Sequence, residues 1–248
     1  MKTLLVTVAG MSTRFSQSLG KACLKCIYYE NDIKEALLYR MLYRETVFDR
    51  YIIVGGFMFQ ELKLVIDRYF KGLKDKIILI ENRQYAEYGS GYSLYLGMQE
   101  ALRSGTDELV FAEGDLYIDA GSFGKVAEAG INVITCNKEN ILASKSVAFY
   151  YDMMYGIHYM YDVGHDMFEI KEPFRGIFNS GQVWKFTQPD RMKKAVQEVS
   201  ASEWRATNLS FIQKYFGDLE KEEYELIEFD KWINCNTIDD FRRIAEVE

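Results

Sequence analysis

The sequence has little proline, cysteine and histidine, with 2 Pro, 4 Cys and 2 His among 248 residues. The scattered cysteines are too few for the disulfide framework of a secreted miniprotein. No window approaches the roughly 18 uninterrupted apolar residues of a membrane-spanning helix. The first ten residues also lack the small-residue cleavage pattern of a secretory leader. We therefore expect a cytoplasmic protein without membrane insertion.

Basic residues are also in the minority, with Lys+Arg 30 against Asp+Glu 37 and a formal net charge of -7. A general nucleic-acid binder needs a basic face to neutralise many phosphates, so this class is excluded. A polyanionic substrate would have to be met by a few local cations and a metal. Repeats, low-complexity tracts and linkers are absent from the sequence, which predicts one domain over residues 1–248.

The first half of the chain alternates between strand-like and helix-like patterns. Short apolar runs predict buried strands, and periodic stretches between them predict helices. The expected strands are residues 3–8, 51–56, 76–80, 108–112 and 131–136, and the expected helices are residues 33–48, 59–70 and 92–102. This alternation predicts an α/β fold with a mostly parallel sheet.

Beyond about residue 145 the sequence becomes aromatic and strand-like. We expect antiparallel additions to the sheet here. The expected strands are residues 147–153, 157–161, 167–171, 176–186 and 224–229, and the expected helices are residues 190–199, 203–215 and one from 238.

Two loops follow expected strands, at the edge where open α/β sheets bind ligands. The loop at residues 9–21 carries hydroxyls, two cations and free backbone N–H groups, which could cradle a triphosphate or form a solvated surface loop. It lacks the Walker A pattern. The acidic turn at residues 113–119 could place Asp115 to hold Mg²⁺ or simply to cap a turn.

These loops resemble the motifs of sugar-phosphate nucleotidyltransferases, which have Ala-Gly-x-Gly-Thr-Arg and then Pro-Lys. The sequence keeps Ala9, Gly10, Thr13, Arg14 and Lys21, with the spacing from Arg14 to Lys21 of bacterial N-acetylglucosamine-1-phosphate uridylyltransferases. The segment ENRQYAEYGSGYSLYL at residues 81–96 is similar to a segment of bacterial CTP:phosphocholine cytidylyltransferases. Residues 179–181 and 236–241 stand where that family has its substrate-side strand and its second metal ligand.

The resemblance implies a Rossmann-like, GT-A-type nucleotidyltransferase fold, a mixed, mostly parallel sheet flanked by helices. Its nucleotide-binding half would be about residues 1–136 and its acceptor half about 137–248. It also implies a reaction in which a phosphorylated acceptor, such as phosphocholine or an aminoalkylphosphonate, attacks the α-phosphorus of CTP and releases pyrophosphate. The product would serve cell-surface polysaccharide biosynthesis. The implied partners are CTP and the acceptor, and homodimer formation is left open.

The resemblance further assigns roles to residues. Arg14 and Lys21 would hold the triphosphate and stabilise the developing charge, while Asp115 and Asn236 would bind Mg²⁺. The implied nucleotide-binding residues are Ala9, Gly10, Met11, Ser12, Thr13, Asn82, Tyr88, Gly89 and Ser90.

Three positions depart from the family pattern. Ser12 replaces the second glycine of the first loop, where backbone normally approaches phosphate. Gly20 replaces the proline before the lysine and loosens the loop. Asn236 matches the uridylyltransferases, because the phosphocholine branch has Asp at this position.

An aromatic segment over residues 149–162 could form a box for a quaternary ammonium or a protonated amine, or could simply pack in the core. The candidate acceptor-binding residues are Tyr151, Tyr155, Tyr159, Glu172, Trp184 and Trp204, and Arg175 and Glu203 could also contact the acceptor.

Zinc and histidine chemistry have little support. Cys23 and Cys26 have the spacing of half a zinc site, but a second cysteine pair is absent from the sequence. His158 and His165 are expected to be packing or surface residues, because the implied reaction needs neither.

Two alternative functions are left open by the sequence. One is a sugar-1-phosphate uridylyltransferase or thymidylyltransferase, favoured by Asn236 and by the spacing from Arg14 to Lys21. The other is an inactive nucleotide-binding regulatory protein, suggested by Ser12 and Gly20.

Overall fold

The computed structural model describes residues 1–44, 47–161 and 166–247. The strands are β1 (Lys2–Val8), β2 (Arg50–Gly55), β3 (Ile77–Glu81), β4 (Glu108–Glu113), β5 (Leu116–Ile118), β6 (Asn132–Asn137), β7 (Ala148–Asp152), β8 (Ile157–Tyr159), β9 (Phe174–Ser180), β10 (Val183–Phe186), β11 (Tyr224–Phe229) and β12 (Trp232–Asn234). The helices are α1 (Thr13–Leu19), α2 (Leu37–Arg44), α3 (Phe59–Tyr69), α4 (Ser90–Arg103), α5 (Ala120–Glu128), α6 (Pro189–Glu198), α7 (Leu209–Phe216) and α8 (Ile238–Val247). Short 3-10 helices are η1 (Lys25–Ile27), η2 (Ile33–Glu35), η3 (Lys71–Lys76), η4 (Glu203–Arg205) and η5 (Lys221–Glu223).

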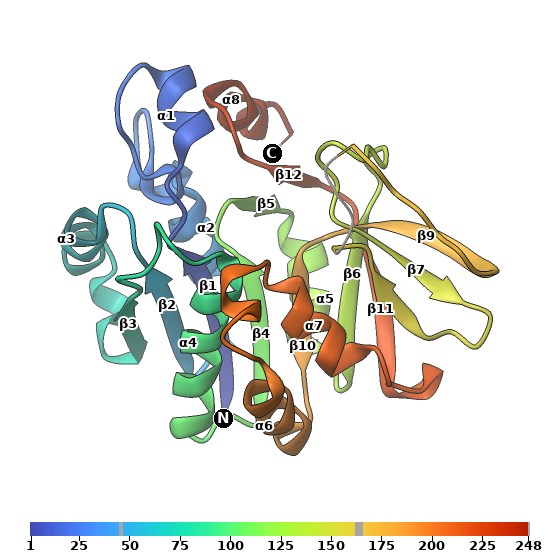
Figure 1. Ribbon diagram of the computed structural model, residues 1–248. Coiled ribbons are helices and arrows are strands. Elements are labelled where there is room, and N and C mark those ends of the chain that lie inside the picture. Colours follow the sequence, from blue (N-terminus) through green and yellow to red (C-terminus); the bar gives the residue numbers. More distant parts are fainter. Residues whose placement is uncertain (45–46, 162–165, 248) are drawn as a thin grey trace.

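Within these ranges ten strands form one sheet in the order β3-β2-β1-β4-β10-β6-β9-β7-β8, with β11 paired to β6 (Figure 1). The pairs β1–β2, β2–β3 and β1–β4 are parallel. Strand β10 runs antiparallel between β4 and β6, and β9, β7 and β8 extend the sheet antiparallel. The predicted α/β class and the antiparallel additions are confirmed.

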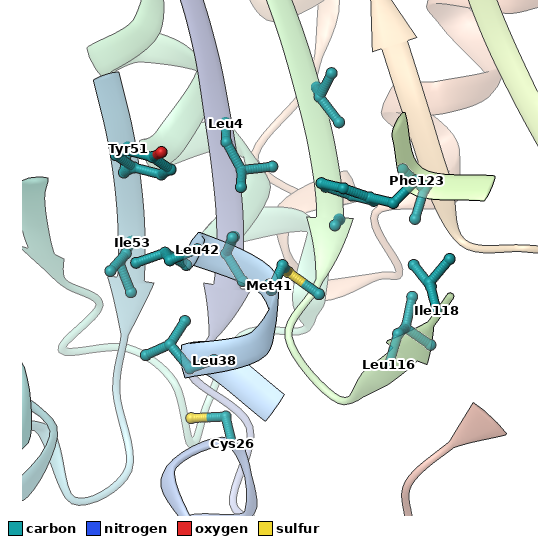
Figure 2. Packing of buried hydrophobic residues seen from close by; sticks show 14 of the residues in the cluster. Leu4, Cys26, Leu38, Met41, Leu42, Tyr51, Ile53, Leu116, Ile118 and Phe123 are labelled. Atoms are coloured by element: carbon teal, nitrogen blue, oxygen red, sulfur yellow. The ribbon is translucent and has the colours of Figure 1, made fainter. Parts of the chain in front are cut away.

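Helices cover both faces of this sheet. On one face Leu4 of β1 packs in a cluster with residues of α2, α3 and α5, including Leu42 and Phe123 (Figure 2). On the other face the next residue, Leu5, packs in a cluster with residues of α4, α6 and α7. Consecutive residues of a strand point to opposite faces, so burial on both sides explains the continuous apolar run of β1.

The carboxyl ends of β1, β2 and β4 point toward α1 and α8, which lie side by side at the top of Figure 1. Phe15 of α1 contacts Phe241 of α8 with ring centroids 6.5 Å apart. Both belong to a buried cluster with Ile233 and Ile238. This packing brings the C-terminal segment next to the loop that follows β1.

Several predicted elements differ from the observed ones. The expected helix at residues 33–48 is η2 followed by α2, and residues 45–46 lie outside the described ranges. The expected strand at residues 167–171 is wrong: these residues pair with no described strand, and Met167 is 55% exposed. The expected strand at 176–186 is two strands, β9 and β10, because the chain turns between them, where Gln182 has a left-handed backbone with φ 56°.

The expected helix at residues 203–215 is also interrupted, between η4 and α7. The carbonyl of Ala206 accepts the N–H of Gly91 at 3.2 Å instead of continuing a helical ladder. Within the described part of the chain, the helices are too short or too polar to cross a bilayer.

Candidate active site

A cavity of about 230 Å³ opens at the carboxyl ends of β1 and β4. We call it the first cavity. It is lined by the end of β1 and its loop, by the segment around η1, by the start of α4 and by the turn after β4. The lining residues are Thr7, Val8, Ala9, Gly10, Ser12, Leu24, Lys25, Cys26, Tyr85, Tyr88, Gly89, Ser90, Ser93, Glu113, Gly114 and Asp115.

The loop after β1 contributes backbone and one hydroxyl to this cavity. Gly10 has open space where a Cβ would stand, and Ser12 adopts a left-handed backbone with φ 51°. Such a φ is costly for a residue other than glycine, which explains why the family pattern has glycine there. Met11 and Thr13 are exposed and lie outside the lining of the cavity.

The two lysines of the first loop differ in placement. Lys21 follows the left-handed Gly20, is exposed, and does not line the first cavity. Lys25 begins η1, whose neighbours Leu24, Cys26 and Ile27 are buried. Cys26 packs in the same core cluster as Leu38 (Figure 2). Buried neighbours on both sides therefore fix the backbone of Lys25 and aim its side chain into the first cavity.

The ammonium of Lys25 bridges two residues that come from distant parts of the chain. Its Nζ lies 2.7 Å from Oδ2 of Asp115 and 3.2 Å from Oδ1 of Asn236. Arg14 Nη2 donates to the same Asn236 Oδ1 at 2.9 Å. The structure thus brings together Arg14, Asp115 and Asn236, to which the resemblance assigns roles, and places Lys25 between Asp115 and Asn236.

A two-stranded sheet brings Asn236 to Asp115. Strand β12 pairs antiparallel with β5, and the N–H of Cys235 donates to the carbonyl of Asp115 at 2.8 Å. The backbone N–H groups of Asn236 and Thr237 donate to Oδ2 of Asp240, which fixes the start of α8. Asp115 and Asn236 are therefore held by short, local hydrogen bonds rather than by flexible loops.

The oxygen atoms at this junction fit a hard divalent cation only in part. Oδ1 of Asp115 is buried and finds no hydrogen-bond partner among the described residues, so it is available as a ligand. Oδ2 of Asp115 and Oδ1 of Asn236 already accept from Lys25 and Arg14. The described residues contain no group of three or more His, Cys, Asp or Glu side chains that could hold a metal. A cation here would need ligands from a substrate, as Mg²⁺ often does.

Glu113 is an acidic residue of the first cavity that the sequence analysis did not single out. Burial, with a contribution from nearby Asp115, raises its pKa from 4.5 to about 7. Its Oε1 accepts from Nδ2 of Asn208 at 2.7 Å. Perturbed carboxyl pKa values are common at functional sites, and the signal available in the sequence was its position two residues before Asp115.

The start of α4 forms the opposite wall of the first cavity. Tyr88, Gly89 and Ser90, which the resemblance assigns to nucleotide binding, line it. A Cβ at Gly89 would collide with the carbonyl oxygen of Ala206, so glycine is required for the 203–208 segment to pack here. Asn82 lies beneath the cavity, where it is buried and donates to Ser93 at 2.9 Å.

A second cavity, of about 630 Å³, lies on the other side of Asn236. Its side chains include the cations Arg14, Lys145 and Arg243, the carboxylates Glu139 and Asp240, and several amides. Trp232 is its one aromatic residue among those described. The complete lining is Arg14, Glu139, Asn140, Ser144, Lys145, Ser146, Val147, Asn179, Gln182, Trp232, Ile233, Asn234, Asn236, Thr237, Asp240 and Arg243. Arg14 and Asn236 line this second cavity, and Asn236 connects it to the first cavity through its contact with Lys25.

The candidate acceptor-binding residues do not gather at either cavity. Tyr151, Tyr159 and Trp184 are buried in the core, where Trp184 Nε1 donates to the Tyr159 hydroxyl at 2.6 Å. Tyr155 lies under the guanidinium of Arg175, 4.3 Å from its ring centroid.

The two other candidates also lie apart. Glu172 accepts from the hydroxyl of Tyr150 at 2.7 Å, in a separate groove beside β8. Trp204 packs on Tyr95 and Tyr92 of α4. Of the two histidines, His158 pairs with Asp152 at 2.9 Å, and His165 lies outside the described residues.

Comparisons with known proteins agree with this architecture. A family model described as Domain of unknown function (DUF6564) matches residues 21–248. No curated protein sequence matches the chain.

Three solved structures share the fold. The inositol-1-phosphate CTP transferase from T. maritima superposes with a TM-score of 0.66 at 16% identity, over 100% of this chain and 96% of that one. The CTP:phosphocholine cytidylyltransferase from Streptococcus pneumoniae gives 0.64 at 16% identity, over 99% and 98%. A Bacillus anthracis protein assigned as a glucose-1-phosphate thymidylyltransferase gives 0.69 at 12% identity, over 100% and 95%. At these identities the similarity establishes the Rossmann-like nucleotidyltransferase fold.

Proposed function

The chain belongs to the family described as Domain of unknown function (DUF6564), and we propose that it is a nucleotidyltransferase that transfers the cytidylyl group of CTP to a small phosphorylated alcohol. The observation that carries the proposal is the junction of Asp115, Asn236 and Lys25 between two cavities. A transfer reaction needs two substrates whose phosphates meet at one point, and this junction is such a point.

In the proposed reaction an anionic phosphate oxygen of the acceptor forms a bond to the α-phosphorus of CTP. The bond from the α-phosphorus to its bridging oxygen breaks, and pyrophosphate leaves with the electron pair. The acceptor oxygen is already anionic, so a general base is not required. Lys25 and Arg14 would neutralise the charge that builds on the phosphates. A divalent cation at Asp115 and Asn236 would add to that neutralisation.

The first cavity suits the nucleotide. Backbone around Gly10 and Ser12 can face the phosphates, and the N-terminal end of α4 favours negative charge. Tyr88 stands at the same end of α4 and offers a ring on which a base can stack. The choice of CTP is supported by the similarity of residues 81–96 to cytidylyltransferases, and two of the three similar structures carry CTP in their names.

The second cavity suits the acceptor. Three cations can hold a phosphate, whereas Asn179, Gln182 and Asn234 offer paired donors and acceptors that match hydroxyl groups. Asn179 is buried, and its Oδ1 has no partner among the described residues. A box for a quaternary ammonium needs several aromatic faces, and Trp232 alone supplies one. The lining therefore favours an acceptor with further hydroxyls over phosphocholine.

Thermal shift with CTP, UTP, dTTP and ATP tests the nucleotide half of the proposal. A ligand present at about 100 times its dissociation constant adds roughly 2.7 kcal/mol of stability. CTP is expected to stabilise the chain most, and Lys25→Ala, which removes the cation of the first cavity, to reduce that shift. Stabilisation by UTP or dTTP without CTP would reject the cytidylyl assignment.

Acceptor kinetics test the other half. The acceptors compared are glycerol 3-phosphate, inositol 1-phosphate, glucose 1-phosphate and phosphocholine. Asn179→Ala is expected to raise the acceptor KM about tenfold, the loss of one buried hydrogen bond, and to leave the CTP KM unchanged. The matched control is Tyr155→Phe, which lies away from both cavities.

A further inference from the structure

Lys25 occupies the position between Asp115 and Asn236 that a divalent cation would share. Its ammonium is 2.7 Å and 3.2 Å from their oxygens, and both partners are only partly exposed, Lys25 at 17% and Asp115 at 22%. An ion pair that is largely withdrawn from water is screened much less than a surface pair. Lys25 is therefore an internal counter-ion for Asp115.

A second observation shows that this arrangement is incomplete. Oδ1 of Asp115 is buried and has no hydrogen-bond partner among the described residues, although the other oxygen of the same carboxylate is paired. A buried carboxylate oxygen without a donor is costly unless a ligand satisfies it. A cation that reached Oδ1 now would lie beside the ammonium of Lys25 on the same carboxylate.

We propose that Lys25 gates a divalent-cation site at Asp115 and Asn236, so that the cation binds there only after a nucleotide triphosphate has drawn the ammonium away. The displacement of Lys25 by a nucleotide rests on the proposed function. The triphosphate in the first cavity competes with Asp115 for Lys25, because it carries more negative charge than one carboxylate. Once Lys25 has moved to the phosphates, Asp115 and Asn236 would hold the cation, and the phosphates would supply further ligands.

The placement of Lys25 supports such an exchange. Its backbone is fixed by buried Leu24 and Cys26, and its long side chain lines the same cavity as Gly10 and Ser12. A lysine can therefore turn from Asp115 to the phosphates by side-chain rotation alone. Lys21, which the family spacing indicates, is exposed, and the residue that donates to Asp115 is Lys25.

Binding of Mn²⁺ alone to the full chain, followed by the electron paramagnetic resonance signal of the free ion, tests the gate without any turnover. Wild type is expected to bind Mn²⁺ weakly. Lys25→Met is expected to bind at least tenfold more tightly, and the double variant Lys25→Met with Asp115→Asn to lose that gain. Lys21→Met, which removes a charge from the same loop, is the matched control and is expected to bind as wild type does.

Two further measurements keep the inference open to refutation. Lys25→Gln replaces Lys25→Met if the latter loses its melting transition, and Lys25→Arg is expected to behave as wild type because the charge is kept. Equal Mn²⁺ affinity in wild type and in the charge-free variants would overturn the gate. Tight wild-type binding that depends on Asp115 would overturn it too. Since no nucleotide is present, these outcomes are independent of whether CTP is the substrate.

Discussion

The backbone N–H of Lys25 donates a hydrogen bond to the hydroxyl of Ser12 at 3.3 Å. Ser12 stands where the nucleotidyltransferase pattern has glycine, and it has a strained, left-handed backbone with φ 51°. Its hydroxyl links the loop after β1 to the turn that carries Lys25. The departure from the family pattern is thus joined directly to the residue that the pattern does not contain.

Substitution of Ser12 separates these two effects. Ser12→Ala keeps the left-handed backbone but loses the hydroxyl, so we expect the free energy of unfolding to fall by about 0.5–1.5 kcal/mol. Ser12→Gly also loses the hydroxyl but relieves roughly 1–2 kcal/mol of backbone strain, so its stability is expected to stay near that of wild type. Urea unfolding measures both values. Equal destabilisation by the two variants would argue against strain at Ser12.

Lys25 and Lys21 are expected to differ in their effect on turnover. Lys25→Ala removes a cation from the point where the phosphates meet, and the loss of one such group lowers kcat by about 10²–10³-fold. Lys21→Ala removes an exposed cation outside the two cavities, so a smaller loss is expected. Pyrophosphate release compares the two, and circular dichroism checks that both fold. A larger loss of kcat for Lys21→Ala than for Lys25→Ala would show that Lys21, as the family spacing indicates, is the main phosphate-binding lysine.

Glu113 gives the stability a specific dependence on pH. Burial raises its folded-state pKa to about 7 from 4.5 in the unfolded chain. The folded state therefore binds more protons between these values, and the contribution of Glu113 to stability is present below pH 4.5 and is lost as pH rises toward 7. Glu113→Gln cannot ionise, so it is expected to lose less stability than wild type between pH 4.5 and 7.5.

The melting temperature of metal-free protein in this pH range provides the measurement. The matched control is Glu222→Gln, which removes an exposed carboxylate that does not line the first cavity. Identical pH profiles for wild type and Glu113→Gln would mean that the carboxyl of Glu113 is ionised throughout.

Trp184 is expected to act through packing rather than through acceptor binding. It is fully buried, stacks on Phe111 with ring centroids 5.3 Å apart, and donates to Tyr159. Trp184→Phe leaves a cavity and removes the hydrogen bond to the Tyr159 hydroxyl, so we expect a loss of about 1–3 kcal/mol in the free energy of unfolding. The acceptor KM is expected to be unchanged. A raised KM at full stability would restore the aromatic-box hypothesis for this residue.

Strong local patterns predicted most of the fold. The apolar run of β1 and the periodicity of α3 and α4 correspond to observed elements, because burial imposes the same period on sequence and structure. Helix α5 was not predicted, although Phe123, Val126 and Ala127 have helical spacing and Asp119 caps it through Ser122. With only 9 residues, this helix depends on packing against the sheet more than on its own pattern.

The sequence predicted those residues of the candidate site that belong to motifs and lie on well-ordered turns. Arg14, Asp115 and Asn236 meet as the resemblance implies, because β5 and β12 hold the two ligand positions together. Lys25 was missed because motif spacing indicates Lys21, whereas the placement of Lys25 depends on the burial of its neighbours. The signal in the sequence was a lysine flanked by two apolar residues, Leu24 and Cys26. The aromatic segment was ambiguous, since alternating aromatics suit both a ligand box and a core.

Pyrophosphate release from CTP, measured with Mg²⁺ against a panel of phosphorylated acceptors, tests the central claim most directly. We predict release with at least one hydroxyl-bearing phosphate monoester, greater than with phosphocholine, and its loss in Asp115→Ala. Release that requires UTP or dTTP instead of CTP would contradict the cytidylyl assignment. Absence of release with every nucleotide and acceptor, from protein that melts cooperatively, would contradict the claim that this junction transfers nucleotides.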